Sequence, residues 1–276
     1  VITSEDPKVV GDQLVGDPRV DMISFTGSTA VGKAIMARAA ATVKKVFLEL
    51  GGKSANIMLD DADFSQSLLT ALAVCFHSGQ GCAIHTRLLV PKSRQAEAEE
   101  LLKTYFTFIE YGDPDSDQIM GPVVNKRQYE RVLAYIEKGK QEGARVLLGG
   151  GAADHIEKGY YIQPTVFVDV TNDMTIAQEE IFGPVLCVIA YDDEEDAVRI
   201  ANDSVYGLSA GVWSASEARA LAVARRIRAG TVNVNGGSFY GPDAPFGGYK
   251  QSGIGREMGP EGFEEYLETK TIAIGA

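Results

Sequence analysis

Apolar runs typical of strands alternate with helical patterns along most of the chain. Residues 21–25 (DMISF) and 46–50 (VFLEL) are predicted to be buried strands on either side of a helix that begins near Thr29, and residues 54–59 (SANIML) a third strand. Strands that alternate with helices form mostly parallel sheets with helices on both faces. The pattern therefore predicts an α/β protein with open, mostly parallel sheets and flanking helices.

A longer helix is predicted to begin at Phe64, with Asp63 as its N-cap. Gly79 is expected to end this helix in a left-handed turn. The apolar residues that share one predicted face of the helix are Leu68, Leu69, Leu72, Cys75 and Phe76.

The same alternation continues as far as residue 230. Further strands are predicted at 87–91, 144–150, 164–170 and 183–191, and further helices at 93–109, 126–142, 193–203 and 215–230. A glycine-rich loop over 239–259 follows, and an alternating strand at 269–274 closes the chain. Because this last strand has no partner nearby in sequence, we expect it to pair with another part of the molecule or with another subunit.

Composition narrows the class of protein. The 276 residues are 45% hydrophobic and 23% charged, as in globular domains. The net charge of −12 argues against a nucleic-acid partner, because phosphate backbones would be repelled. No run of eighteen apolar residues and no basic leader before an apolar run is present, so we expect no membrane span and a cytoplasmic location.

The few cysteines and histidines suggest no metal site. The three cysteines contain no Cys-x-x-Cys pair and the three histidines no His-Glu-x-x-His spacing. We therefore expect no disulfide framework and no metal.

Cys82 is the first candidate for chemistry. It follows Gly79, Gln80 and Gly81, where missing side chains leave room for a substrate and leave backbone N–H groups able to stabilise an oxyanion. The two interpretations are a nucleophile and an idle loop cysteine. Cys75 and Cys187 lie in apolar runs and are interpreted as core residues.

A cysteine nucleophile needs help to form a thiolate, and His77 and His85 are the histidines nearest to Cys82 in sequence. A cysteine–histidine pair would indicate a thiol hydrolase or esterase. No spacing fixes either histidine beside the sulfur, so both could equally be surface residues.

Glu49 ends an apolar predicted strand and is followed by two glycines within LELGGKS. Ligands of open α/β sheets bind at the carboxyl ends of strands, and burial there would raise the pKa of a carboxyl towards that of a general base. The alternative is a glutamate that simply turns to water.

Two further motifs carry weaker signals. In FTGSTAVGK (25–33) a strand leads through a turn into a helix whose N-terminus could hold a phosphate, although an ordinary strand-to-helix turn has the same composition. In QEEIFGPV (178–185), Glu180 and Phe182 would share a face if the stretch is extended.

Taken together and in this order, the motifs FTGSTAVGK, LELGGKS, GQGC, EEIFGPV, NDSVYGLSAGVW, VNVNG and PFGGYKQSGIGRE resemble the NAD(P)-dependent aldehyde dehydrogenase superfamily. The resemblance covers nearly all of this chain. It implies that Cys82 attacks an aldehyde to give a thiohemiacetal and then a thioester, and that Glu49 activates the water that releases the acid. Because coenzyme A-acylating members commonly lack this glutamate, its presence favours an acid product.

The resemblance also implies a cofactor, NAD, with NADP left open, and the residues that hold it. Cofactor-binding positions would be Phe25, then Gly27, Ser28 and Gly32 at the pyrophosphate-binding turn and helix, Leu50 and Gly51 at the nicotinamide amide, Glu180 at the nicotinamide ribose and Phe182 beside it. Phe246 would line the tunnel for a small-molecule aldehyde.

The implied domains are the end of a Rossmann-type NAD(P)-binding domain at 1–50, a complete catalytic domain at 51–250, and a return segment with an oligomerisation strand at 251–276. That strand implies a homo-oligomer, either a dimer or a tetramer.

The resemblance covers only about the last three-fifths of a typical member, and most of the cofactor domain is not matched. The unmatched part holds the lysine that meets the adenosine ribose and the asparagine that completes the oxyanion hole. Loss of one oxyanion donor costs roughly 3–4 kcal/mol of barrier. We therefore expect the isolated chain to bind NAD poorly and turn over slowly or not at all, and a truncated assembly module without catalysis is a further alternative.

Overall fold

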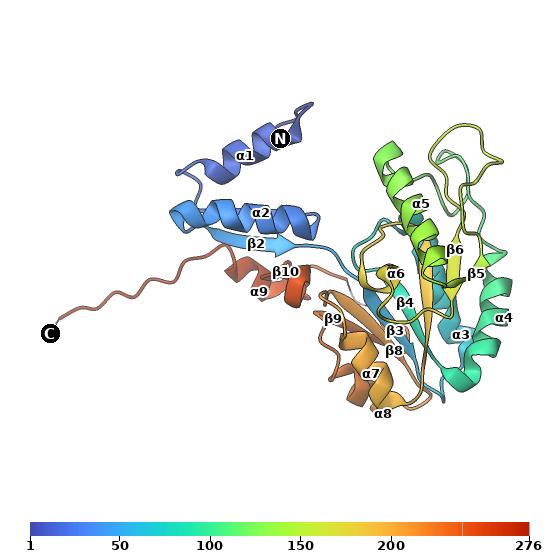
Figure 1. The fold of residues 1–276 in the computed structure, drawn as a ribbon. Helices are drawn as coiled ribbons and strands as arrows, with labels where there is room; N and C mark the ends of the chain where they lie inside the picture. The colour runs from blue at the N-terminus through green and yellow to red at the C-terminus, as the bar shows by residue number, and fades with distance from the viewer. Residues whose placement is uncertain (239, 276) are drawn as a thin grey trace. The chain divides into compact units, whose positions relative to one another are not determined.

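The apolar runs of the sequence form two separate sheets in the computed structural model, which describes residues 1–238 and 240–275. The chain divides into two compact units, one made of residues 1–51 together with the described residues from 240 to 275, the other of residues 52–238. Figure 1 follows the chain through both units.

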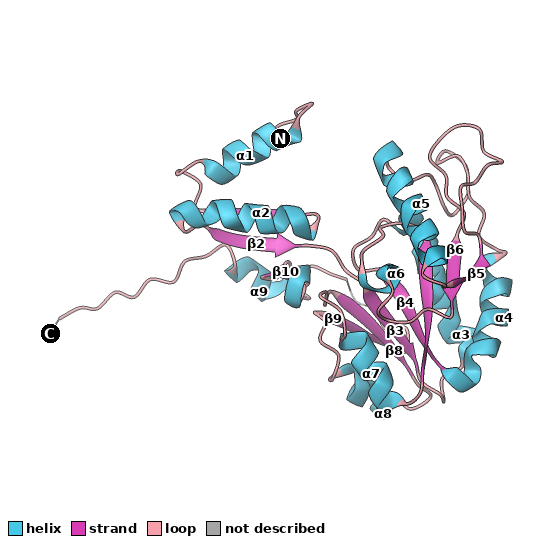
Figure 2. Ribbon diagram, in the orientation of Figure 1, coloured by secondary structure: helices cyan, strands magenta, loops and turns pink. Residues whose placement is uncertain are grey.

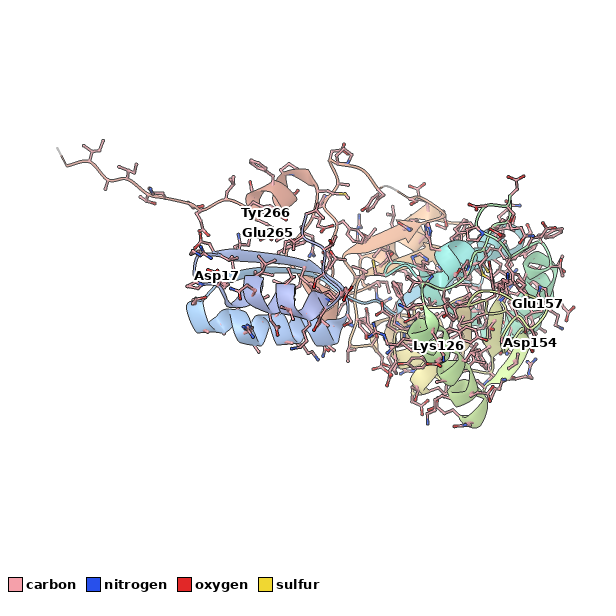
Figure 3. The ribbon with its side chains drawn as sticks, turned by 90° about the horizontal axis from the view of Figure 1, so that it is seen from above. Asp17, Lys126, Asp154, Glu157, Glu265 and Tyr266 are labelled. Atoms are coloured by element: carbon pink, nitrogen blue, oxygen red, sulfur yellow. The ribbon has the colours of Figure 1, made fainter. Side chains whose placement is uncertain are left out.

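The first unit contains a sheet of three strands in the order β1-β2-β10, in which β1 and β2 are parallel and β10 is antiparallel to β2. Its elements are α1 (Pro7–Gly16), β1 (Met22–Thr26), α2 (Thr29–Ala39), β2 (Lys45–Glu49), β10 (Gly253–Ile254) and α9 (Gly259–Glu264), with short 3-10 turns at Ala40–Thr42 and Lys250–Ser252. A hydrogen bond links the end of α9 to β2: Lys45 Nζ donates to the carbonyl of Glu265. Glu265 is labelled in Figure 3. Segments more than two hundred residues apart thus form one unit.

The second unit contains seven strands in the order β5-β6-β7-β4-β3-β8-β9, all parallel to their neighbours except β5. Its strands are β3 (Ser54–Met58), β4 (His85–Pro91), β5 (Arg145–Leu148), β6 (Thr165–Val168), β7 (Val185–Tyr191), β8 (Ser209–Trp213) and β9 (Thr231–Val234). Its helices are α3 (Phe64–Ser67), α4 (Gln95–Phe106), α5 (Lys126–Gln141), α6 (Thr175–Gln178), α7 (Glu194–Asn202) and α8 (Glu217–Ala224), with 3-10 segments η2 (Leu68–Gly79) and η3 (Lys92–Arg94).

Helices cover both faces of the seven-stranded sheet, and Figure 2 shows α4 on the opposite side of it from α7 and α8. Alternate residues of each central strand enter different cores: Leu89 packs with α5 to α8, whereas Leu88 packs with α3, η2 and α4. Strands buried on both faces read as continuous apolar runs, which is why the sequence marks them so clearly.

Most predicted elements are present, and the helix after Asp63 differs most. It is a short α3 followed by 3-10 turns, and Phe76 leaves helical geometry with ψ at 135°. Leu69 and Phe76 are 43% and 51% exposed, so the predicted apolar face is wrong at those two positions. The buried residues of this stretch instead include Ala71 and Val74.

For the C-terminal segment, pairing within the chain is not seen among the described residues, and pairing with another subunit stays a prediction. Residues 269–274 form no strand, and Ile272 and Ile274 are exposed. A strand is defined by its hydrogen-bonded partner, and this segment has none among the described residues. Within the described part of the chain, no helix is both long enough and apolar enough to cross a membrane.

Candidate active site

Cys82 lies in the loop that precedes β4, at the amino-terminal edge of the seven-stranded sheet. Its side chain is partly exposed, whereas Cys75 and Cys187 are buried. A Cβ added at Gly52 would lie 2.4 Å from the carbonyl oxygen of Cys82, so any larger residue would push the loop away. The glycine of LELGGKS that precedes β3 is therefore required for the close approach of two backbones.

Glu180 reaches the same place from the loop before β7. The N–H of Gly52 donates to Glu180 Oε1 at 3.0 Å. Burial raises the pKa of the Glu180 carboxyl, and this effect is opposed by the Gly52 hydrogen bond and by the positive charges of Lys53 and Arg131. Gly52 thus brings the predicted nucleophile and the predicted ribose-binding acid to one edge of the second unit.

Phe182 does not follow the alternation that the sequence suggested. Its φ is +58°, in the left-handed region, so the stretch around it is not a regular strand and the argument that Glu180 and Phe182 share a face does not apply. Gly183 follows, and a Cβ there would lie 2.5 Å from Val132 of α5. The turn is therefore packed tightly against that helix.

Glu49 belongs to the first unit, where it ends β2 at its carboxyl end, as predicted. The side chain is buried, and neither carboxylate oxygen has a hydrogen-bond partner among the described residues. Burial raises the pKa of Glu49 to about 8, with a further contribution from the nearby charge of Glu257 and an opposing one from Arg256. Such a group can take up and release a proton near neutral pH.

Phe246 lies in this first unit. Its backbone exchanges two hydrogen bonds of 2.7 Å with Glu257, and its ring packs edge-on against Tyr240. The next residue, Gly247, would carry a Cβ 2.9 Å from Glu49 Oε1. Phe246 is therefore close to the predicted base in the first unit.

The turn from β1 into α2 is built around small residues. A Cβ on Gly27 would lie 2.5 Å from the ring of Phe25, and one on Gly32 would lie 2.7 Å from Leu50 Cδ2. Ser28 caps α2 by accepting from the N–H of Val31 at 3.4 Å. The remaining N–H groups at the start of a helix lack acceptors within it, and they favour an anion.

Leu50 and Gly51 are held by Ser252. The N–H of Leu50 donates to the carbonyl of Ser252 at 2.8 Å, and the hydroxyl of Ser252 donates to the carbonyl of Gly51 at 2.6 Å. The Leu50 N–H and the Gly51 carbonyl are therefore hydrogen-bonded within the first unit.

The histidines give little support to a cysteine–histidine pair. His85 Nε2 lies 3.2 Å from Ser209 Oγ, and burial lowers the pKa of His85 to about 4. The imidazole is therefore neutral near pH 7. The side chain of His77 is exposed.

The model of the aldehyde dehydrogenase family matches residues 1–272. The chain belongs to the aldehyde dehydrogenase family. Among curated proteins, this aldehyde dehydrogenase chain is 48% identical to a 3-succinoylsemialdehyde-pyridine dehydrogenase of a Pseudomonas species over 98% of its own length and 57% of the relative's. It is also 47% identical to a putative aldehyde dehydrogenase of Staphylococcus saprophyticus, over 99% of its length and 58% of the relative's.

Solved structures of the family agree with the fold. An aldehyde dehydrogenase from Pseudomonas syringae, crystallised as a cysteine-to-alanine mutant with NAD+ and octanal, matches with a TM-score of 0.92 and 50% identity over 95% of this chain and 54% of that one. An aldehyde dehydrogenase of Mycobacterium tuberculosis with NAD+ matches with a TM-score of 0.89 and 48% identity over 92% and 53%. The chain thus spans a little over half the length of the relatives it matches.

Helix α5 supplies contacts to the loop of residues 179–182 that the sequence did not reveal. Gln128 Nε2 donates to the carbonyl of Phe182 at 2.7 Å, Arg131 donates to the carbonyl of Glu180 at 2.8 Å, and Tyr135 donates to the Glu179 carboxylate at 2.6 Å. Residues 128, 131 and 135 share one helix face by their spacing. The sequence signal for these contacts is that spacing. It is weak, because polar residues on one helix face usually point to solvent.

Two buried cations beside the site were also missed. Arg87 donates to the carbonyls of Lys53, Ile200 and Ala201 and to Asn172 Oδ1. Lys53 Nζ is buried without a hydrogen-bond partner among the described residues, and burial lowers its pKa. Both residues stand at the amino-terminal ends of strands, where sequence patterns favour a solvated charge.

Proposed function

We propose that this chain is the catalytic portion of an enzyme that oxidises an aldehyde to a carboxylic acid with NAD+, NADP+ being the alternative. The observation that carries the proposal is the position of Gly52, which lies against the carbonyl of Cys82 and donates to the carboxylate of Glu180. Family membership and the likeness to structures solved with NAD+ support it.

Cys82 is the nucleophile in this proposal. Its thiolate attacks the aldehyde carbon, the carbonyl oxygen becomes an oxyanion, and the product is a thiohemiacetal. Backbone N–H groups of the glycine-rich loop are suited to stabilise that oxyanion. Hydride acceptance is the chemistry that a nicotinamide ring supplies when bound. Cys82 then carries the acyl group as a thioester.

Glu49 is the base that completes the reaction. Its carboxylate takes a proton from water, the resulting hydroxide attacks the thioester carbon, and the carbon–sulfur bond breaks to release the acid and the thiolate. The raised pKa suits this role, because the group changes protonation close to neutral pH.

The residues present fit a dinucleotide. The start of α2 offers helix N–H groups beside Gly27 and Ser28, and the packing of Phe25 against Gly27 leaves no room there for a side chain. The carbonyl of Leu50 and the carboxylate of Glu180 are the acceptors for a nicotinamide amide and a ribose hydroxyl. Because the chain covers little over half of its relatives, we expect residues 1–276 alone to bind NAD weakly.

The test is pre-steady-state NADH formation by a protein in which this chain is joined to the remainder of the family fold. With octanal as the aldehyde, Glu49→Gln is expected to keep a burst of one NADH per site and lose steady-state turnover, whereas Cys82→Ala loses both. His85→Asn is the matched control and should keep both. A Glu49→Gln protein without a burst would contradict the base assignment, and activity in Cys82→Ala would contradict the nucleophile.

Titration calorimetry checks the expectation for the isolated chain. NAD binding by residues 1–276 at micromolar concentration would refute weak binding, and NADP measured in parallel distinguishes the cofactors. Light scattering tests the proposed dimer or tetramer, with Ile272→Asp as a variant that should weaken assembly if residues 269–274 form the intersubunit strand.

A further inference from the structure

Three consecutive left-handed residues precede the loop of Cys82. His77 has φ +51° and ψ +27°, Ser78 has φ +54° and ψ +37°, and Gly79 has φ +72°. Glycine adopts this region freely, but for other residues the left-handed conformation costs about 1–2 kcal/mol each. Two adjacent non-glycine residues therefore hold a conformation that the surrounding contacts must maintain.

Ser78 provides the contact that maintains it. The side chain is 2% exposed, and its hydroxyl donates to the carbonyl of Gly121 at 2.6 Å, with the carbonyl of Pro122 at 3.4 Å. This hydrogen bond is not local, because residue 121 lies 43 positions after Ser78 in the sequence. The hydroxyl thus ties the turn to a separate segment of the second unit.

The turn has a second point of attachment and a tight neighbour. The side chain of Gln80 donates to the carbonyl of His77 at 3.0 Å and accepts from the N–H of Val124 at 2.9 Å. A Cβ on Gly79 would lie 2.0 Å from the carbonyl oxygen of Gly183, so the turn lies directly on the loop that follows Phe182. Any relaxation of the turn must move residues 80–82, which continue from it without an intervening element.

We propose that Ser78 is a positioning residue for Cys82, and that its hydroxyl bond to Gly121 fixes the left-handed turn that aligns the sulfur and its loop for attack on a carbonyl carbon. The proposal rests on the assignment of Cys82 as nucleophile. Without the hydroxyl, residues 77 and 78 can adopt ordinary backbone conformations. The loop of residues 80–82 that follows them is then no longer held in one orientation.

Two probe reactions, on the protein in which this chain is joined to the remainder of the family fold, distinguish alignment of Cys82 from its exposure. With p-nitrophenyl acetate, the Cys82 thiolate attacks the ester carbonyl through an oxyanion, the carbon–oxygen bond to the aryl group breaks, and p-nitrophenolate leaves as the acetyl thioester forms. With iodoacetamide, the same thiolate displaces iodide from a saturated carbon. Only the first reaction needs N–H groups aligned on an oxyanion. Neither reaction needs a cofactor.

Ser78→Ala is expected to slow acetylation of Cys82 by roughly tenfold or more, because small displacements of reacting groups cost one to two orders of magnitude. Alkylation of Cys82 should change by less than about threefold, since exposure is not reduced. His77→Gly is the matched control: it removes strain from the neighbouring left-handed residue, keeps the Ser78 hydroxyl, and should leave both rates near those of the unmodified chain.

Cys75 and Cys187 report on folding, because both are buried and should stay unalkylated in a folded chain. If Ser78→Ala exposes them, Ser78→Gly is used in its place. Glycine relieves the backbone strain but still lacks the link to Gly121, so this variant should show a selective loss of acetylation that is smaller than that of Ser78→Ala. Peptide mass spectrometry assigns each modification.

The outcomes distinguish the two proposals. If Cys82 of the unmodified chain is not acetylated, or Cys82→Ala releases nitrophenolate equally fast, the assignment of the nucleophile fails. If Cys82 is acetylated and the ratio of acetylation to alkylation is the same in the Ser78 variants, the nucleophile stands and the positioning role of Ser78 is overturned.

Discussion

The buried carboxyl of Glu49 makes a prediction about stability that is independent of catalysis. Burial raises its pKa from 4.5 to about 8, helped by the charge of Glu257. The unfolded chain has the ordinary value, so it ionises from about pH 4.5 upward while the folded chain keeps its proton. Because the folded pKa is the higher one, the stabilisation is complete below about pH 4.5 and is lost as the pH rises through about 8.

The size of the effect follows from the two pKa values. The folded and unfolded pKa values differ by about 3.5, and at 1.36 kcal/mol for each pKa unit this corresponds to a change in the free energy of unfolding of about 5 kcal/mol across the whole pH range. By linkage, about 0.8 kcal/mol of this is lost by pH 5 and about 3.3 kcal/mol by pH 7. Glu49→Gln keeps the shape of the side chain without its charge. The variant should therefore gain about 2.5 kcal/mol of stability relative to the unmodified chain between pH 5 and pH 7.

Urea unfolding followed by circular dichroism at pH 5, 6, 7 and 8 measures the difference between the two chains. Glu268→Gln is the control, because this exposed glutamate lies in the C-terminal segment without secondary structure, and its curve should run parallel to that of the unmodified chain. A difference between Glu49→Gln and the unmodified chain that stays constant from pH 5 to pH 8 would refute the reasoning. It would mean that Glu49 titrates equally in both states and is not buried as described.

Three further predictions concern contacts around the site. Gly79→Ala should prevent native packing, because its Cβ would lie 2.0 Å from the carbonyl oxygen of Gly183. Gly143→Ala is the control: its φ is +95° and a Cβ would meet nothing within 4 Å, so a denaturation curve should show a free energy of unfolding lower by only about 1–2 kcal/mol. Arg87→Met should lower the free energy of unfolding by about 3 kcal/mol or more, since it leaves buried carbonyls unsatisfied, and an unchanged urea midpoint would contradict this. Ser28→Ala should lower the local stability at the start of α2 by about 0.5–1 kcal/mol, which amide hydrogen exchange measures as faster exchange there, with no change in β4.

Much of the fold was accessible from the sequence because its signals are local. Strands buried on both faces, such as β7, appear as unbroken apolar runs, and helices such as α5 begin and end within one or two residues of their predicted bounds. The glycine at 79 was assigned a left-handed conformation from its place after an apolar helix, and its φ of +72° confirms this. Family membership also followed from short motifs in a fixed order.

The features that escaped prediction depend on partners far away in sequence. Ser78 is left-handed because Gly121 accepts its hydroxyl, and Phe182 is left-handed while Gln128 holds its carbonyl. Neither residue type favours that conformation, so no local pattern reports it. The exposure of Leu69 has the same origin: the helix breaks into 3-10 turns, which rotates positions away from the face that a 3.6-residue period assigns to them.

The segment Glu49–Lys53 explains why one short motif carries so much of the chemistry. Its first residue closes β2 in one unit, and its last precedes β3 in the other. Within those five residues are a buried carboxyl with no hydrogen-bond partner among the described residues, a backbone held by Ser252, and Gly52, on which a Cβ would meet the Cys82 carbonyl and whose N–H donates to Glu180. Because the approach to Cys82 and the hydrogen bond to Glu180 both involve the Gly52 backbone, a side chain added at Gly52 would displace the Cys82 loop and the Glu180 hydrogen bond together. The motif is therefore constrained by backbone geometry as much as by the acid–base role proposed for Glu49.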